Sequence, residues 1–308
     1  MNEKVNALIE NIERVIVGKR EVIVKVVAAM LCGGHVLIED VPGVGKTQLV
    51  SALAKSVNGK YNRIQLTPDI MPSDIVGFSM VDQQTGELVY KEGAAMCNFL
   101  LADEINRASP KSQSSLLEVM EEHQISIDGK TYRLPEPFMT LATQNPVETY
   151  GTYHLPEAQM DRFIMKISIG YPSPEQELEI VSHSEQGVTA AKVEAVMDTS
   201  DISSLMEQAN KVYMADPVRQ YVVSIVNATR NSPLIRLGVS PRGSIALVKA
   251  AKAFAFTLGR DYVTPDDVRY LASDCLAHRL ILSPKGKSQF PTNEAALGAV
   301  LMTVPAPQ

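Results

Sequence analysis

Hydrophobic and polar positions divide the chain into two unlike halves. As far as Pro172, short apolar runs of strand length alternate with helical patterns. We expect strands at residues 36–38, 61–66, 99–102, 138–143 and 163–169, and helices at 4–16, 21–31, 48–55 and 109–121. Strands that alternate with helices predict an α/β fold in which a five-stranded parallel sheet lies between layers of helices.

Beyond Pro172 the pattern changes to helices only. Four helix starts are marked by a polar residue followed by proline, at Ser173, Asp216, Ser240 and Thr264. A polar cap with proline at the first helical position is typical of a helix N-terminus. We therefore expect an α/β core at residues 1–172 and an all-helical subdomain at 173–308, in which 283–290 is a polar loop before an apolar tail.

Two short hairpins interrupt the first half. Residues 78–92 carry two apolar stretches around a turn at Thr85-Gly86, and residues 125–134 carry Asp128-Gly129 at their centre. The segment 65–77 that precedes the first hairpin contains two prolines and cannot be one regular helix.

Composition narrows the class of protein. The chain has 308 residues, 45% of them apolar and 21% charged, with a net charge of −6. This composition is ordinary for a soluble globular protein, and the negative net charge does not support a large nucleic-acid-binding surface. No apolar run approaches the roughly 18 residues of a membrane span, and the amphipathic N-terminus is not a signal peptide. Cys32, Cys97 and Cys275 form no CxxC pair, which favours buried thiols in a reducing cytoplasm.

Residues 35–50, HVLIEDVPGVGKTQLV, carry the strongest chemical signal. A buried strand leads into a glycine turn and then into a helix. Gly43 and Gly45 would let backbone N–H groups approach an anion, and the helix N-terminus adds partial positive charge. This is the unit of P-loop nucleotide hydrolases, although the first glycine of that motif is replaced by Asp40. The alternative is a glycine-rich connection with no ligand.

Each residue of the loop then has an expected role. Lys46 would reach the β- and γ-phosphates of ATP, and the Thr47 hydroxyl would bind Mg²⁺. The nucleotide-binding residues predicted here are Pro42, Gly43, Val44, Gly45, Lys46, Thr47 and Gln48.

Two acids follow the apolar run at 99–102. Asp103 and Glu104 would lie at the sheet edge where the P-loop helix begins. Asp103 would hold Mg²⁺, and Glu104 would act as a general base on the attacking water. Without the P-loop the same pair would be two solvated acids at a strand end.

A polar amide ends the strand at 138–143. Asn145 could orient the water and touch the γ-phosphate, or it could simply form the turn.

Three arginines are further candidates. Arg162 precedes the last core strand, a position on the subunit flank from which it could face a neighbour's nucleotide; otherwise it would pair with Asp161 or Glu157. Arg242 lies at a helix start, where a cation opposes the helix dipole, so it either meets a phosphate or is solvated. Arg107 could contact a neighbour or pair with Glu104.

Together these residues resemble the AAA+ ATPases and, within them, the MoxR family. The similarity runs from about residue 15 to residue 280. Its most specific stretches are QLTPDIMPSDIVG at 65–77, LLADEINRA at 100–108, ATQNPVE at 142–148 and LPEAQMDRF at 155–163.

The resemblance implies roles that spacing alone does not. Val17 and Gly18 would lie beside the adenine, and Asn145 would sense the γ-phosphate. Arg162 would be the arginine finger and Arg242 the sensor of the lid. Members of the family form rings, often hexameric, are commonly paired with von Willebrand A-type proteins, and are thought to act as chaperones in maturation or metal insertion.

Several functions compete at this stage. We favour a Mg²⁺-dependent ATPase ring that remodels a protein client through its two hairpins. A nucleotide-binding scaffold with little turnover is the alternative. A GTPase is disfavoured because no N-K-x-D motif occurs in the sequence. A small-molecule kinase is disfavoured because the helical half would have no role in it. A DNA motor is disfavoured because the net charge of the chain is negative.

Overall fold

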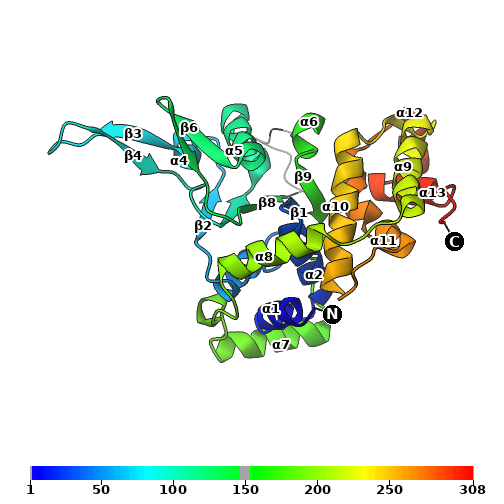
Figure 1. Cartoon of the computed structure of the whole chain (residues 1–308), viewed down its shortest axis with the longest axis horizontal. Coiled ribbons are helices and arrows are strands. Elements are labelled where there is room, and N and C mark those ends of the chain that lie inside the picture. Colours follow the sequence, from blue (N-terminus) through cyan, green and yellow to red (C-terminus); the bar gives the residue numbers. More distant parts are fainter. Residues whose placement is uncertain (1, 146–152, 154, 308) are drawn as a thin grey trace.

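A five-stranded parallel sheet lies at the centre of the computed structural model, which describes residues 2–145, 153 and 155–307 (Figure 1). The strand order is β2-β5-β8-β1-β9. The strands are β1 (His35–Glu39), β2 (Tyr61–Gln65), β5 (Phe99–Asp103), β8 (Met139–Gln144) and β9 (Phe163–Ile167). All five predicted strands are confirmed, and every neighbouring pair is parallel.

Both faces of the sheet are buried, and successive side chains point to opposite faces. Val36 and Ile38 of β1 belong to one apolar cluster, and Leu37 between them belongs to a second cluster on the other face. The first cluster is built with helices α1 (Glu3–Glu13), α2 (Arg20–Leu31) and α3 (Lys46–Ser56), and the second with α5 (Pro110–Glu122). The predicted layered α/β core is therefore present.

Two hairpins stand out from the core as predicted. Strands β3 (Gly77–Val81) and β4 (Leu88–Glu92) form one, and β6 (Gln124–Ile127) and β7 (Lys130–Arg133) form the other. Figure 1 shows the β3–β4 hairpin projecting from the body of the molecule. The short helix α4 (Pro72–Val76) precedes it, in the segment that its prolines prevent from being one long helix.

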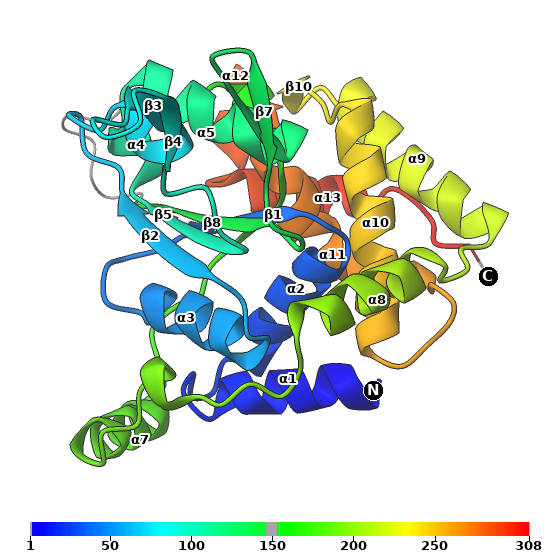
Figure 2. The same cartoon turned by 60° about the vertical axis from the view of Figure 1, so that its left-hand side comes forward.

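The second half is mainly helical. Ser173, Ser240 and Thr264 cap their helices through side-chain oxygens, as predicted. The longer helices are α7 (Pro174–Glu185), α8 (Thr199–Asn210), α9 (Asp216–Asn231), α10 (Pro241–Thr257), α11 (Pro265–Leu276) and α13 (Asn293–Leu301). Helices α8 and α10 pack against α2 of the core, whereas α7 lies at the outer edge of the molecule and buries none of its residues (Figure 2).

Two local features of this half differ from the sequence expectation. The prediction of a loop at 283–290 is wrong, because Ser283 accepts a hydrogen bond from Gly286 N and caps a short helix, α12 (Pro284–Gln289). The glycine and the polar residues of that segment obscure a helix start of the same kind as those at Ser173, Ser240 and Thr264. The prediction that Asp216 caps its helix is wrong: Asp216 is already the first residue of α9, and Ala215, the residue before it, has no side-chain oxygen that could cap the helix. A two-stranded antiparallel pair, β10 (Ile235–Leu237) with β11 (Ile281–Leu282), was also not predicted.

Within the described part of the chain, no helix is long and apolar enough to cross a membrane.

Candidate active site

The loop between β1 and α3 has the shape of a phosphate-binding loop. Gly43 and Gly45 adopt left-handed backbone conformations, with φ of 85° and 93°. A Cβ on either glycine would meet no described atom within 4 Å, so backbone conformation rather than crowding requires glycine. Gly45 precedes the first turn of α3, whose unpaired N–H groups and dipole favour an anion.

A cavity of about 340 Å³ lies beside this loop and gathers most of the predicted site. It is lined from the carboxyl ends of β1, β2, β5 and β8, the edge at which ligands bind in parallel sheets. Its lining residues are Asp40, Pro42, Gly43, Gly45, Lys46, Thr47, Gln48, Arg63, Gln65, Asp103, Glu104, Thr143 and Asn145.

The two acids differ in their surroundings. Asp103 is buried, and its Oδ1 accepts a hydrogen bond of 3.1 Å from the Thr143 hydroxyl. That hydroxyl in turn accepts from Glu104 N at 2.9 Å. Glu104 adopts a left-handed backbone, with φ 57°, which is costly for a residue with a Cβ and turns the chain sharply after the strand. Its carboxylate pairs with Arg107 at 3.3 Å, one of the two contacts expected for that arginine.

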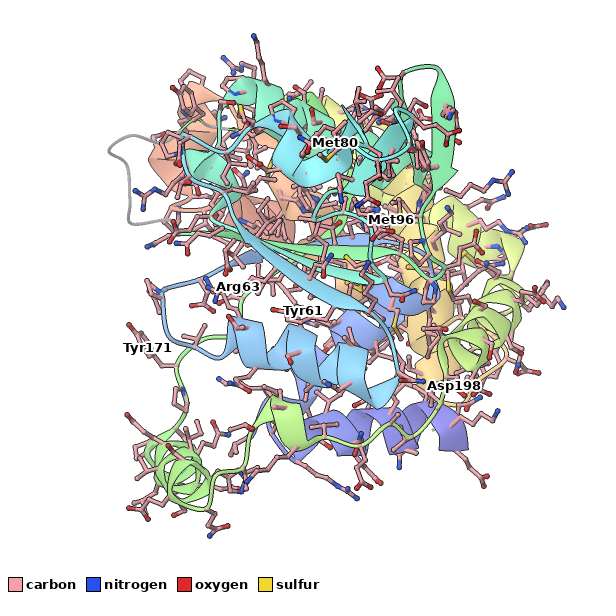
Figure 3. All side chains as sticks on the ribbon, turned by 90° about the vertical axis from the view of Figure 1, so that its left-hand side faces the viewer. Tyr61, Arg63, Met80, Met96, Tyr171 and Asp198 are labelled. Carbon is pink, nitrogen blue, oxygen red and sulfur yellow. The ribbon has the colours of Figure 1, made fainter. Side chains whose placement is uncertain are left out.

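Sequence reasoning did not find Arg63 and Thr143. Arg63 lies on β2, and its Nε donates to Asp103 Oδ2 at 2.7 Å (Figure 3). Both residues lie on strands that were predicted correctly, Thr143 near the end of β8 and Arg63 at the middle of β2. For Thr143, the rule that strand ends share one sheet edge was the available signal. Which side chain of each strand points toward the acids depends on sheet register, which the sequence does not specify.

Asp40 takes the place of the usual first glycine and ties the loop to the end of β9. Its Oδ2 accepts hydrogen bonds from Ile169 N and Gly170 N, both at 2.7 Å, and from the Ser168 hydroxyl at 3.0 Å. Its backbone carbonyl accepts from Lys46 Nζ at 2.6 Å. The side chain and carbonyl of Asp40 therefore hold the phosphate-binding loop in place, although the usual first glycine is absent.

The charges of the cavity suit a nucleotide with a metal ion. Burial lowers the pKa of Lys46, and the carboxylates of Asp40, Asp103 and Glu104 oppose that shift. A phosphate beside Lys46 would add a counter-charge. Thr47 and Asp103 supply the oxygen donors that Mg²⁺ prefers.

The protein does not supply a complete metal site. In the described residues, no cluster of three or more His, Cys, Asp or Glu side chains could hold a metal ion. Phosphate oxygens and waters would have to complete the coordination, which is usual for Mg²⁺. Because Arg63 pairs with Asp103 in this structure, Mg²⁺ would compete with that arginine.

A second cavity, of about 330 Å³, adjoins the other side of the loop. This cavity is lined by Val17, Val44, Gln48, Tyr171 and Ile180 among others. Its walls are therefore largely apolar, which suits the flat ring of a nucleotide base. Val17, which the family resemblance places beside the adenine, and Val44 of the phosphate-binding loop thus line the same cavity. Gly18 does not line either cavity; its carbonyl accepts a hydrogen bond of 3.4 Å from Gln176 Nε2 in α7.

Arg162 and Arg242 do not reach the loop cavity. Arg162 immediately precedes β9, whose first residue pairs with His35 at the start of β1. The phosphate-binding loop follows the other end of β1, one strand length or about 16 Å away. Both arginines instead contact Glu121, with 3.0 Å from Arg162 Nη2 to Oε2 and 2.6 Å from Arg242 Nη2 to Oε1. Neither acid expected to pair with Arg162 is the observed partner.

Asp161, the residue before Arg162, contacts the helical half of the molecule. Its Oδ2 accepts from the hydroxyl of Ser240, the cap of the helix that carries Arg242, at 2.7 Å. Its Oδ1 lies 2.9 Å from Nε of Arg279, which is buried. These contacts join the core to the helical half, and no local sequence pattern could have indicated them.

Comparison with known proteins agrees with this geometry. A model of the ATPase family associated with various cellular activities (AAA) matches residues 35–165, and a model of the AAA lid domain matches 227–297. The crystal structure of a protein from Cytophaga hutchinsonii, named as a candidate ATPase, superposes on this chain with a TM-score of 0.92. The two sequences are 38% identical, and the match covers 99% of this chain and 96% of that one.

Named relatives are similar over nearly the whole chain. YeaC of Bacillus subtilis is 49% identical over 97% of this chain and 93% of its own length. Chaperone MoxR1 of Mycobacterium tuberculosis is 43% identical over 96% of this chain and 81% of its own. Protein MoxR of Paracoccus denitrificans is 32% identical, over 95% and 93%.

The fold and the phosphate-binding loop define a member of the AAA class of P-loop ATPases, with an α/β core and a lid. Within that class, the chain belongs to the MoxR family.

Proposed function

We propose that this protein hydrolyses ATP with Mg²⁺ as a hexameric ring, by analogy with its class, and that each active site is shared by two copies. One copy supplies the phosphate-binding loop, Asp103, Glu104 and Asn145. The neighbouring copy supplies Arg162 and Arg242, which act on the γ-phosphate as its charge redistributes in the transition state.

One observation carries this proposal. Glu104 and Lys46 line the cavity at the carboxyl ends of the strands, whereas Arg162 stands at the opposite ends of the same strands. Arg162 therefore cannot serve its own nucleotide without a rearrangement of the sheet. A head-to-tail contact between copies, which closes into a ring, would bring it to the next nucleotide.

The chemistry follows from the positions of the side chains. Bound Mg²⁺, held through Thr47 and Asp103, would offset charge on the phosphate oxygens. Glu104 would accept a proton from the attacking water, and Asn145 at the end of β8 would orient that water. Lys46 would contact the β- and γ-phosphates.

The β3–β4 hairpin is the surface that we propose for a protein client. It exposes Phe78, Met80, Val81, Leu88 and Val89, an unusual concentration of apolar side chains on a projecting element. The β6–β7 hairpin would contribute a second contact. This supports a chaperone-like role in remodelling or maturation of a protein client, and the relative MoxR1 is named a chaperone.

We place the core at residues 1–172 and the lid at 173–308, and we expect the protein to work in the cytoplasm, with a von Willebrand A-type protein as a partner. A scaffold that binds ATP with little turnover is the alternative function. We favour hydrolysis over the scaffold because the chain has Glu104 as a general base and Arg162 and Arg242 for the site of a neighbouring copy.

Two substitutions separate binding from hydrolysis. Glu104→Gln should bind a fluorescent ATP analogue as the native protein does but hydrolyse ATP about 10² to 10⁴ times more slowly, because the general base is lost. Lys46→Ala should lose binding itself. Glu207→Gln, an exposed change on α8, is the matched control and should behave as native.

The same measurements can contradict the proposal. A native rate in Glu104→Gln would remove its assigned role. A native protein that binds Mg²⁺ and ATP in an assembled ring but turns over no faster than Glu104→Gln would favour the scaffold.

A further inference from the structure

We propose that Glu121 is a positioning residue that holds Arg162 and Arg242 together as a pair for the phosphate of a neighbouring copy's nucleotide. The inference rests on the shared site proposed above. It concerns a residue at the end of α5 that no sequence motif marks.

Glu121 divides its carboxylate between the two arginines. Oε2 lies 3.0 Å from Arg162 Nη2, and Oε1 lies 2.6 Å from Arg242 Nη2. Arg162 comes from the edge of the core and Arg242 from α10 of the lid, so this one side chain joins arginines from both halves of the molecule.

The pair keeps donors for a further anion. A guanidinium group has five N–H donors, and Glu121 contacts one nitrogen of each arginine. Nε of Arg162 is buried without a hydrogen-bond partner in the described part of the chain. Arginines bind phosphate through paired N–H groups, so both could contact a phosphate while still bound to Glu121.

The cavity around the pair also favours an anion. It has a volume of about 220 Å³. Four cationic side chains line it, against two carboxylates; the cations are Arg162, Arg242, Lys249 and Arg279, and the carboxylates are Glu121 and Asp161. The described lining therefore carries an excess of positive charge, which a phosphate group would offset.

Without Glu121 the pair would not stay assembled. Two guanidinium groups repel each other, and Arg242 lies in the first turn of α10, where the helix dipole also disfavours a cation. Its side chain is 56% exposed and could turn into solvent. A carboxylate between the two groups offsets both effects.

Glu121 is itself held firmly. The preceding residue, Met120, is buried, and its carbonyl pairs with Nε2 of the buried His35 at 2.8 Å. Burial lowers the pKa of His35 to about 4, so the imidazole is neutral and its Nε2–H donates to that carbonyl while Nδ1 accepts from Thr140 N. The backbone of α5 at this point is thus fixed to β1.

The test is a double-mutant cycle between Glu121 and the arginine pair. For each variant, kcat and KM for ATP are measured in the presence of Mg²⁺, and ring assembly is measured separately. The variants are Glu121→Gln, Arg162→Ala with Arg242→Ala, and all three changes together. Glu121→Gln should lower kcat about ten- to a hundredfold by misplacing the arginines, with KM and assembly unchanged. It should cause no further loss in the protein that lacks both arginines, because residues that act as a unit are not additive.

The adjacent exposed glutamate gives a matched control. Glu122→Gln removes the same charge from the same helix and should leave kcat as in the native protein. The Glu121 inference is overturned if Glu121→Gln keeps the native kcat, or if its loss is equally large without the arginines. If the variant lacking both arginines hydrolyses ATP at the native rate, the proposal of a shared active site is contradicted. The Glu121 inference, which rests on that proposal, is then contradicted as well.

Discussion

At the scale of single residues, Asp40 shows how the phosphate-binding loop is held. A glycine at this position could make no side-chain hydrogen bonds. Asp40 instead accepts hydrogen bonds from three consecutive residues at the end of β9, Ser168, Ile169 and Gly170. That segment leads directly to Tyr171 and Pro172, where the chain passes to α7. The loop that would hold the nucleotide is thus fixed to the connection between the two halves of the molecule.

The charge of Asp40 should be measurable in stability. Asp40→Asn should lower the free energy of unfolding by about 1–2 kcal/mol at pH 7, because hydrogen bonds to a charged acceptor are the stronger ones. Burial raises the pKa of Asp40, but hydrogen bonds from Gly170, Ser168, Val41 and Ile169 outweigh it, and the pKa is lowered.

The sign of the pH dependence follows from that shift. The unfolded chain takes up the proton at a higher pH than the folded protein, so the stabilisation by Asp40 is present above the unfolded pKa. It is lost as the pH falls through the folded pKa. Urea unfolding of both proteins from pH 7 down to pH 3 should show their difference shrinking at the acid end. A difference that stays constant would rule out the carboxylate charge as its source.

At the scale of elements, the β3–β4 hairpin uses two glycines for different reasons. Gly77, at its base, has φ 88°, and a Cβ there would lie 2.2 Å from the Lys91 carbonyl oxygen. Gly86, at its tip, has φ 72°, and a Cβ would meet no described atom within 4 Å. The first glycine is required by crowding and conformation, and the second by conformation alone. The base therefore fixes how the hairpin leaves the core.

The two glycines form a matched pair for an experiment. Gly86→Ala should cost only about 1 kcal/mol of local strain and leave the hairpin protected from amide hydrogen exchange. Gly77→Ala forces the strands apart and should greatly increase exchange across β3 and β4, while the sheet remains protected. Equal exchange in the two variants would show that the close contact at Gly77 does not hold the hairpin.

At the scale of the whole molecule, sequence patterns predicted what is local and missed what is not. The strands, hairpins and helix caps depend on periodicity and on neighbouring residues, so they could be predicted. The loop cavity could be anticipated because parallel strands share one edge. The contact of Arg162 and Arg242 with Glu121 could not, since it depends on how α10 packs against the core. Nor could the pairing of Arg63 with Asp103, which depends on strand register.

The proposed function depends on where the two sets of site residues lie in the whole molecule. A single copy has a phosphate-binding loop at one end of its strands and an arginine pair at the other. Each copy would therefore complete the site of its neighbour, and the two halves of one active site would belong to different chains. Activity should then depend on contact between copies.

The most direct measurement mixes two inactive variants. Lys46→Ala cannot bind ATP, and Arg162→Ala should hydrolyse it about 10³ times more slowly than native if it has lost its arginine finger. In mixed rings, an intact loop of one variant meets an intact Arg162 of the other at about a quarter of the contacts. We predict that the mixture recovers a substantial part of the native rate per subunit. A mixture no more active than the two variants measured separately, in rings shown to exchange subunits, would contradict the shared site.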